Sequence, residues 1–401
     1  MVQRRSNLLT SQRGIVLVAA LLILALLMAG GVGALFSTRT DLRTSGNLKT
    51  GRQAFYIAEA GLSRAWQELN DGDGTNDFDT LSSATGKVLL YDNESFGGGS
   101  HTVVAAGLSG AGVRRVQVTS IGCLPAANPC PSGNSKAVLE AHLRRSSLFQ
   151  CVICATENVT LSAGVKTDSY DSSLGPYRAE QAGKNGHVRS DGSIVLEGAM
   201  TVVEGNVLAN DRVTINDGAT ASGRVTEGVG LQDTSPVASC GPPFHDGSGI
   251  SGGNYNPETG ELRGAGTDAI MLLNGTYCFS SVMLADASTL AVNGPVRVYV
   301  SAPSSFTGGG IVNTTGRAEN LAIFSSVVSP DVGLSVGSGS AAYMTVYAPR
   351  ARINLFGSGD LFGAVVGRIV ANLGPVRLHY DQKLADNEEG RVTLVSWKEV
   401  F

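Results

Sequence analysis

An uncharged apolar run near the N-terminus is the strongest pattern in the chain. Residues 15–36 are 22 residues without a charge, mostly Leu, Val, Ile, Ala and Gly. As a helix rising 1.5 Å per residue, the run is about 33 Å long, enough to cross the hydrocarbon core of a bilayer. Arg4, Arg5 and Arg13 precede it, and the first acidic residue is Asp41. The positive-inside rule therefore places residues 1–14 in the cytoplasm and the chain after the run outside the inner membrane.

Beyond the run, apolar residues keep a helical spacing. After a polar interval at residues 44–52 they continue at intervals of mostly three or four, as Ala54, Phe55, Ala58, Leu62, Ala65, Trp66 and Leu69. A cleaved secretory signal has a shorter apolar core and ends in a cleavage site of small residues. The pattern predicts one helix over residues 15–70 that spans the membrane in its first half and is amphipathic in its second.

From about Phe149 the pattern changes to short alternating apolar segments, each followed by a turn with Gly, Asn or Asp. Small residues at corners and stacked Val, Ile and Leu are typical of a parallel β-solenoid, whereas the strands of an antiparallel β-sandwich are usually longer. We expect a mainly β chain with a parallel, right-handed β-solenoid over residues 149–385. A polar, glycine-rich loop at residues 230–266 is expected to interrupt it. Residues 386–401 are expected to cap its open end with Trp397 and Phe401.

A small α+β unit is expected over residues 71–148. Two alternating segments flank a Pro-rich loop between Cys123 and Cys130, as the strands of a hairpin would. Their apolar faces are expected to cover the apolar stripe of the helix. Because a solenoid buries its core between its own coils, a fragment that begins near Asp71 is expected to fold without the helix.

Composition and charge exclude several classes of protein. Glycine supplies 52 of 401 residues, but without the period of three that collagen needs. Charged residues make up 16% of the chain and the net charge is −4, which argues against a protein that neutralises many nucleic-acid phosphates. The many glycines and few charges favour β-structure rich in turns.

The six cysteines all follow the apolar run, and an even number in an oxidising compartment favours disulfides. The expected pairs are Cys123–Cys130 and Cys240–Cys278. Cys151 and Cys154 form a CxxC motif, but a second CxxC or a nearby histidine pair for zinc is missing. The Val-Ile between them suits a strand, which would point the two side chains to opposite faces. A structural role is therefore favoured, and their pairing stays open.

Two sets of carboxylates are candidates for chemistry. A weak calcium candidate is formed by Asp71, Asp73 and Asp77, but the twelfth position of that loop is Ser82, and a helix-terminating turn is favoured. A polysaccharide-acting β-helix enzyme would draw on Asp168, Asp171, Asp191 and Asp360. The histidines are scattered, no nucleophile motif is present, and aromatic residues are only 6% of the chain. We therefore expect no enzyme, no cofactor and no resident metal.

The N-terminal residues resemble a known family. RGIVLVAALLILALL followed by DLRTSGNLKTGRQAFYIAEAGLSRAWQEL resembles the N-terminal region of PilX-type pilus assembly proteins, which are minor pilins of type IV pili. The resemblance implies cleavage by a prepilin peptidase between Gly14 and Ile15. Pilins usually have phenylalanine and glutamate at the first and fifth mature positions, where this chain has Ile15 and Ala19. Residues 198–225 also resemble bactofilin-like β-helices.

The resemblance implies a type IV pilus-associated minor pilin-like protein that contributes to pilus assembly or adhesion. Its expected partners are other pilin-like subunits and the inner membrane, with a surface ligand or cell-envelope glycan on the solenoid and no nucleic acid. Its expected location is the inner membrane, single-pass with the C-terminal domain in the periplasm, or the pilus and cell surface. The alternative is an uncleaved, membrane-anchored β-helical scaffold or polymer-forming protein; a polysaccharide-acting enzyme is less favoured. Cleavage after Gly14 distinguishes the minor pilin-like protein from the uncleaved scaffold.

Overall fold

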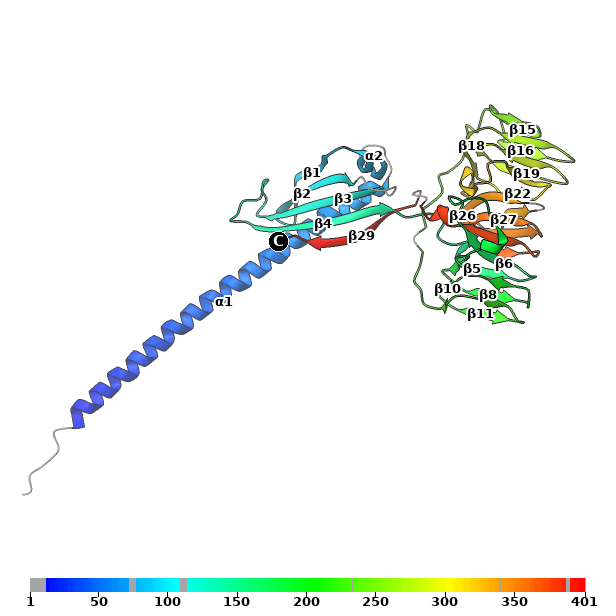
Figure 1. Cartoon of the computed structure of the whole chain (residues 1–401). Coiled ribbons are helices and arrows are strands. Elements are labelled where there is room, and N and C mark those ends of the chain that lie inside the picture. Colours follow the sequence, from blue (N-terminus) through cyan, green and yellow to red (C-terminus); the bar gives the residue numbers. More distant parts are fainter. Residues whose placement is uncertain are drawn as a thin grey trace, which may run out of the picture. The chain divides into compact units, whose positions relative to one another are not determined.

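The computed structural model describes residues 12–71, 77–108, 114–232, 234–338, 341–386 and 390–400. It contains two compact units (Figure 1). The first combines Met1–Arg144 with Leu394–Phe401, and the second is Arg145–Thr393. In the sequence, the second unit is therefore an insertion into the first.

The first unit contains one long helix, α1, which runs from Gln12 to Asp71. With 60 residues it is about 90 Å long at 1.5 Å per residue. Gly30, Gly31 and Gly33 lie within it and the helix continues through them. The predicted long helix is confirmed, with bounds within three residues of those expected.

A five-stranded sheet completes the first unit, with the strand order β1-β2-β3-β4-β29. Its elements are α2 (Phe78–Ser83), β1 (Lys87–Phe96), β2 (Gly99–Leu108), β3 (Arg115–Leu124), β4 (Ser135–Arg145) and β29 (Val392–Glu399). Strands β1 to β4 form an antiparallel meander. The β3–β4 pair is the hairpin predicted around the loop between Cys123 and Cys130, with Cys123 opposite Lys136.

The C-terminal strand corrects one expectation. Strand β29 does not cap the solenoid; it joins the edge of the sheet next to β4, and Val400 N donates to Val138 O at 2.8 Å. Trp397 lies beside Phe55 of α1, with 6.2 Å between the ring centroids. A short alternating strand pairs equally well with any free sheet edge, so its pattern alone could not identify the edge. Phe401 lies outside the described residues.

The second unit is the predicted β-solenoid, with about nine turns. Its first strands are β5 (Ile153–Leu161), β6 (Lys166–Tyr170), β7 (Val188–Ser190), β8 (Ile194–Glu197), β9 (Val202–Val203), β10 (Val207–Ala209), β11 (Val213–Asn216), β12 (Thr220–Ala221) and β13 (Val225–Thr226). The middle strands are β14 (Ile250–Ser251), β15 (Asn254–Asn256), β16 (Glu261–Gly264), β17 (Ala269–Leu272), β18 (Gly275–Phe279), β19 (Ser281–Leu284), β20 (Thr289–Val292) and β21 (Val296–Val300). The last are β22 (Ser304–Phe306), β23 (Gly310–Asn313), β24 (Leu321–Ser325), β25 (Ser329–Ser338), β26 (Ala342–Gly357), β27 (Asp360–Asn372) and β28 (Arg377–Asp381). Three short 3₁₀ helices are Ala179–Gln181, Ala318–Asn320 and Gln382–Asp386.

The coils do not stack in the order of the sequence. Strand β5 pairs in parallel with β7 and β8 on one side and with β27 on the other. Likewise β6 pairs with β9 on one side and with β28 on the other. The chain therefore enters the solenoid in mid-stack, builds outward to β13 at one end, starts again at the opposite end with β14, and returns to meet its first coil (Figure 1). We call the junction of β5–β6 with β27–β28 the seam.

Residues 227–249, the crossing segment, connect the two ends of the stack. At about 4.8 Å per layer, nine turns are about 40 Å high. The 23 residues of the crossing segment reach that distance easily when extended. The predicted loop at residues 230–266 is therefore wrong in its second part, because β14, β15 and β16 lie within it and form the far end of the solenoid.

The core of the second unit is a single cluster of buried side chains between residues 149 and 384. Inward positions stack in ladders: Val298, Ile323, Val346, Val365 and Ile153 follow one another in register and are fully buried. The ladder continues across the seam without a gap, so two segments far apart in sequence form one core.

Residues 145–393 are expected to fold alone, because their core lies within them. The fragment should give a β-type circular dichroism spectrum and a single cooperative unfolding transition. A longer fragment that begins at Asp71 should fold less completely, contrary to the sequence-based expectation. It lacks α1 and therefore uncovers Val103, Val118 and Leu139, which are fully buried in the first unit. We expect that longer fragment to bind a hydrophobic dye. Non-cooperative unfolding of residues 145–393 would contradict this account.

Candidate functional site

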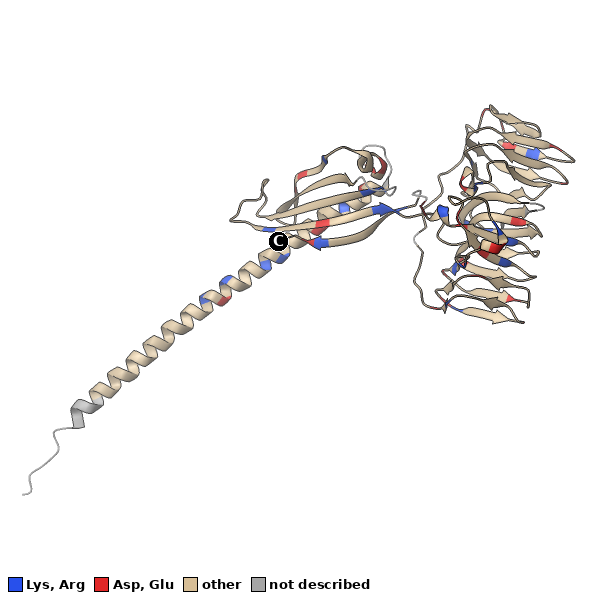
Figure 2. Ribbon diagram, viewed as in Figure 1, with Lys and Arg blue, Asp and Glu red and all other residues tan. Residues whose placement is uncertain are grey.

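The first half of α1 is an exposed apolar surface. The described apolar side chains between Leu17 and Phe36 are 50–71% exposed wherever the residue is large, and the best 18-residue window of the helix has a mean hydropathy of 2.5. In Figure 2 the described side chains of the helix carry no charge from Leu17 to the middle of the helix. A helix of this length and composition is a candidate membrane anchor. The expected span of residues 15–36 falls inside it.

The second half of α1 packs on the sheet through small side chains. Ala54, Ala58 and Ala65 are fully buried. Gly122 of β3 approaches so closely that a Cβ there would lie 2.1 Å from Ala54 O, and a Cβ on Gly61 would lie 2.6 Å from Ser120 Oγ. Small residues on both elements therefore set the helix–sheet distance. This close packing explains why residues 54–62 (AFYIAEAGL) include the small residues Ala54, Ala58 and Gly61.

A polar group is buried beneath the helix at the same place. His101 of β2 is 3% exposed, and burial lowers the pKa of its imidazole. Its Nε2 lies 3.6 Å from Glu94, which pairs with Arg64 of α1. The Arg64 guanidinium also lies over the ring of Tyr91, 4.5 Å from its centroid. These contacts fix the register of α1 on β1 and β2, and burial disfavours the charged form of the His101 imidazole.

An apolar groove opens beside α1 where the helix leaves β4 and β29 uncovered. Its volume is about 190 Å³. It is lined mainly by Phe55, Leu62, Trp66, Leu143, Leu394 and Trp397. Trp66 and Trp397 are 42% and 54% exposed. The edge of the helix that lies beside β4 and β29 therefore presents apolar residues beyond the expected membrane span.

In the second unit, polar side chains join the two sides of the seam. Asn372 Oδ1 accepts from Ser162 N at 2.7 Å, and Asn372 Nδ2 donates to Ser162 O at 2.7 Å. Arg368 Nε donates to Glu157 at 2.6 Å, and the hydroxyl of Tyr380 donates to Phe149 O at 2.7 Å. These bonds connect residues more than 200 positions apart, so they hold the last coil to the first.

The most strongly charged part of the seam is centred on His379 of β28. Its Nδ1 lies 2.6 Å from Asp168 Oδ1, and its Nε2 lies 3.0 Å from Asp360 Oδ1. Arg377 Nη2 donates to Asp360 Oδ2 at 2.9 Å, and the hydroxyl of Tyr177 donates to Asp168 Oδ2 at 2.7 Å. An imidazolium, which has a proton on each nitrogen, satisfies both carboxylates.

The electrostatics of this cluster follow from burial and charge. Burial by itself would raise the pKa of Asp360, but hydrogen bonds from His379 and Arg377, with their charges, hold it below its ordinary value. Burial, and then the hydrogen bond to Asp168, raises the pKa of Tyr177. The ring of His379 also stacks on Phe362, with 4.7 Å between centroids. The cluster thus holds the carboxylates of Asp168 and Asp360 and the imidazole of His379 in fixed positions on the outside of the coil.

The structure brings only two of the four candidate catalytic carboxylates together. Asp168 and Asp360 meet through His379, one of the histidines that lie scattered along the sequence. Asp171 accepts from Ser173 N at 2.9 Å within its own turn. Asp191 accepts from Gln232 N at 2.8 Å and so holds the crossing segment. The relation of Asp168 to His379 depends on β6–β28 pairing across 211 residues, which local sequence could not indicate.

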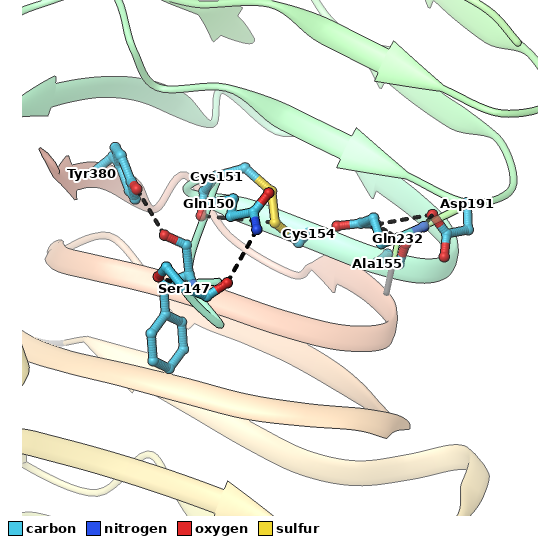
Figure 3. Close-up of a disulfide and its surroundings, with 9 residues drawn as sticks. Ser147, Gln150, Cys151, Cys154, Ala155, Asp191, Gln232 and Tyr380 are labelled. Atoms are coloured by element: carbon cyan, nitrogen blue, oxygen red, sulfur yellow. Dashed lines mark hydrogen bonds between the residues drawn. A yellow bond between two sulfur atoms is a disulfide. The ribbon is translucent and has the colours of Figure 1, made fainter. Parts of the chain in front are cut away.

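The disulfides pair as Cys123–Cys130, Cys240–Cys278 and Cys151–Cys154. The first two are the predicted pairs, and every cysteine of the chain is bonded in the described structure. The expectation that Cys151 and Cys154 point to opposite faces is wrong, because β5 begins only at Ile153 and the bend before it turns Cys151 back (Figure 3). Both cysteines are 2% exposed, in keeping with a structural role.

Asp71 and Asp77, the two described calcium candidates, belong to no group of side chains placed to hold a metal ion. Asp71 is the last residue of α1. Asp77 is the N-cap of α2, where Oδ1 accepts from Thr80 N at 2.8 Å. Asp73 lies outside the described residues. Across the described ranges there is no group of three or more His, Cys, Asp or Glu side chains placed to hold a metal ion.

Comparison with known families supports the assignment of the N-terminal segment. Residues 13–63 match the PilX N-terminal family model. This segment is similar to the N-terminal regions of PilX proteins. It contains the exposed half of α1 and most of the small-residue contact with the sheet. Residues 280–387, which run from β19 to just beyond β28, match a domain of unknown function, DUF7305.

Two solved structures are distantly similar to the chain. One is the competence-associated pilin ComZ from Thermus thermophilus, with 12% identity and a TM-score of 0.24 over 88% of this chain and 98% of that one. The other is the DUF3494 domain of an ice-binding protein from Shewanella frigidimarina, with 12% identity and a TM-score of 0.30 over 59% and 98%. At these scores neither likeness supports an argument about function. A search of the curated proteins found no match.

Replacing His379 with Gln should destabilise residues 145–393 by about 2–3 kcal/mol, because it leaves the carboxylates of Asp168 and Asp360 without their shared partner. Urea unfolding measures this change. The control is Lys383→Gln, which removes an exposed ion pair with Asp386 and should cost less than about 1 kcal/mol. Equal effects of the two substitutions would show that the cluster does not hold the seam.

Acid should weaken the same seam. The pKa of Asp360 is lower in the folded state than its unfolded value of about 3.9, so its ionised form stabilises the fold above that pH. This contribution is lost as the pH falls through the folded pKa. The destabilisation caused by Asp360→Asn should therefore be larger at about pH 5 than at about pH 3, as measured by urea unfolding. Asp217→Asn, at an exposed turn, is the control and should show no such difference.

Proposed function

We propose that this chain is a minor pilin-like protein of a type IV pilus-associated assembly. The observation that carries the proposal is that the PilX N-terminal region coincides with a helix whose first half is exposed and apolar. Its second half is held on a sheet by close small-residue packing. Such a helix joins a membrane-inserted segment to a folded unit and leaves one side available to other helices.

The proposed orientation follows from charge. Arg4, Arg5 and Arg13 remain in the cytoplasm before cleavage, and both folded units lie on the periplasmic side. The three disulfides favour an oxidising compartment. In this proposal the protein is an inner-membrane, single-pass precursor that passes into a pilus.

The proposed partners are other pilin-like subunits. Leu42, Leu48 and Tyr56 of α1 are 60–67% exposed, and the apolar groove with Trp66 and Trp397 lies on the same helix farther along. Helices of neighbouring subunits would bury this surface. The solenoid is proposed to be displayed by the assembly for adhesion to a surface ligand or cell-envelope glycan.

We further propose that the solenoid acts without catalysis. Each of the carboxylates considered for catalysis already has a structural partner. In the cluster best suited to acid–base chemistry, both ring nitrogens of His379 face carboxylates. An imidazole engaged on both nitrogens has no site from which to take a substrate proton.

N-terminal processing tests the proposal. In a host with an active prepilin peptidase, the mature chain should begin at Ile15, as determined by intact mass and N-terminal sequencing. Gly14→Leu should block removal of residues 1–14 and keep the protein out of sheared pilus fractions. Gly30→Leu, a matched change in open space farther along the helix, should leave processing unaffected. An unprocessed wild-type chain would contradict the pilin-like function and favour the uncleaved scaffold.

A further inference from the structure

The two ends of the solenoid differ in how their cores are covered. At the end that begins with β14, antiparallel strands lie over the first parallel layer: β14 pairs with β17 and β15 with β16. Leu262, Ile270 and Leu272 beneath them are fully buried. This end is therefore closed by its own chain.

At the opposite end the last layer is uncovered. Val213, Ile215, Ala221 and Val225 each follow, in register, an inward residue of the preceding layer. Those preceding residues are Ile194, Leu196, Val203 and Val207, and all four are fully buried. Yet Ile215 is 39% and Val225 45% exposed. We call these four residues the open end; they are core positions that lack the next layer.

The backbone at the open end also lacks a full set of partners. In the described chain, β11 pairs only with β8 and β12 only with β9. Residues of a parallel strand alternate between its two neighbours, so every second N–H and C=O of β11 points toward the missing layer. Glu227 supports this geometry, because its carboxylate accepts from Val213 N at 2.8 Å. Ile215 is the next residue of β11 whose N–H and C=O point toward the missing layer. An edge of this kind is a template for another strand.

The charges around the open end indicate which partner fits. Exposed residues of both signs surround it: Asp211, Asp217 and Glu227 are acidic, and Arg212 and Arg224 are basic. A rim of mixed sign can face its own copy across a two-fold axis with opposite charges adjacent. The same axis makes two β11 edges antiparallel, which allows them to pair. The closed end offers no matching parallel layer, so stacking does not continue beyond two copies.

We propose that the open end is a homodimer interface, through which two solenoids pack end to end about a two-fold axis. The four exposed core residues of each copy become the missing layer of the other. This interface lies in the second unit and does not depend on the pilin-like role of α1, so either proposal can fail without the other.

Sedimentation of residues 145–393 tests the interface. The fragment should be a dimer at concentrations about tenfold above a micromolar dissociation constant. Small-angle scattering should show a maximum dimension close to twice that of the monomer. Persistent monomers, a dimer no longer than one solenoid, or long fibres would each overturn the proposal.

Substitutions locate the surface. The double variant Ile215→Asp, Val225→Asp should be monomeric under the same conditions, with the circular dichroism spectrum and cooperative unfolding of the wild type. The control is Met283→Asp, at an outward position of β19 that is 40% exposed, and it should remain dimeric. A folded double variant that still forms the dimer would place the interface elsewhere and refute the proposal.

Discussion

Parallel strand pairing across the seam is the constraint on which the second unit depends. Strands β5 and β6 start the solenoid in mid-stack, so each would have an unpaired edge until β27 and β28 return to it. A buried backbone without partners is costly, which makes the last coil as necessary to the core as the first. The side chains of His379, Asn372 and Arg368 reinforce a junction that the backbone already defines.

Several other features follow from that junction. Because the chain begins in mid-stack, it must cross from one end to the other, and the crossing segment passes Tyr347, an outward residue of β26. Tyr347 donates to Ser235 O at 2.7 Å, and the Cys240–Cys278 disulfide fastens the far part of the segment. The entry and exit of the unit also come together, since Ser146 N donates to Arg391 O at 2.9 Å. Adjacent entry and exit points let a unit of this size be inserted between β4 and β29.

The first unit depends on a different physical feature, the close approach of helix and sheet. Gly122 lies against the backbone of α1 at Ala54 and Ala58, and Gly61 lies against the side chains of Ser120 and His101, so neither glycine leaves room for a larger residue. The helix is thereby held at one end while its apolar first half stays exposed. In the second unit, by contrast, the charged groups of Asp168, Asp360, Arg377 and His379 bond to one another across adjacent coils.

Local patterns were sufficient to predict the long helix, the solenoid, the β3–β4 hairpin and two disulfides. Most of these depend on neighbours close in sequence or on a strong periodicity: the uncharged run at residues 15–36, the short strands with turns, and the seven-residue spacing of Cys123 and Cys130. The Cys240–Cys278 pair, 38 residues apart, followed from the even number of cysteines in an oxidising compartment. The meeting of Asp168 with His379, the place of β29 in the sheet and the order of the coils depended on tertiary structure. A β-strand offers identical hydrogen-bonding groups to any partner of suitable length, so its sequence specifies that it pairs and which face is buried. Only the folded chain decides with which strand it pairs.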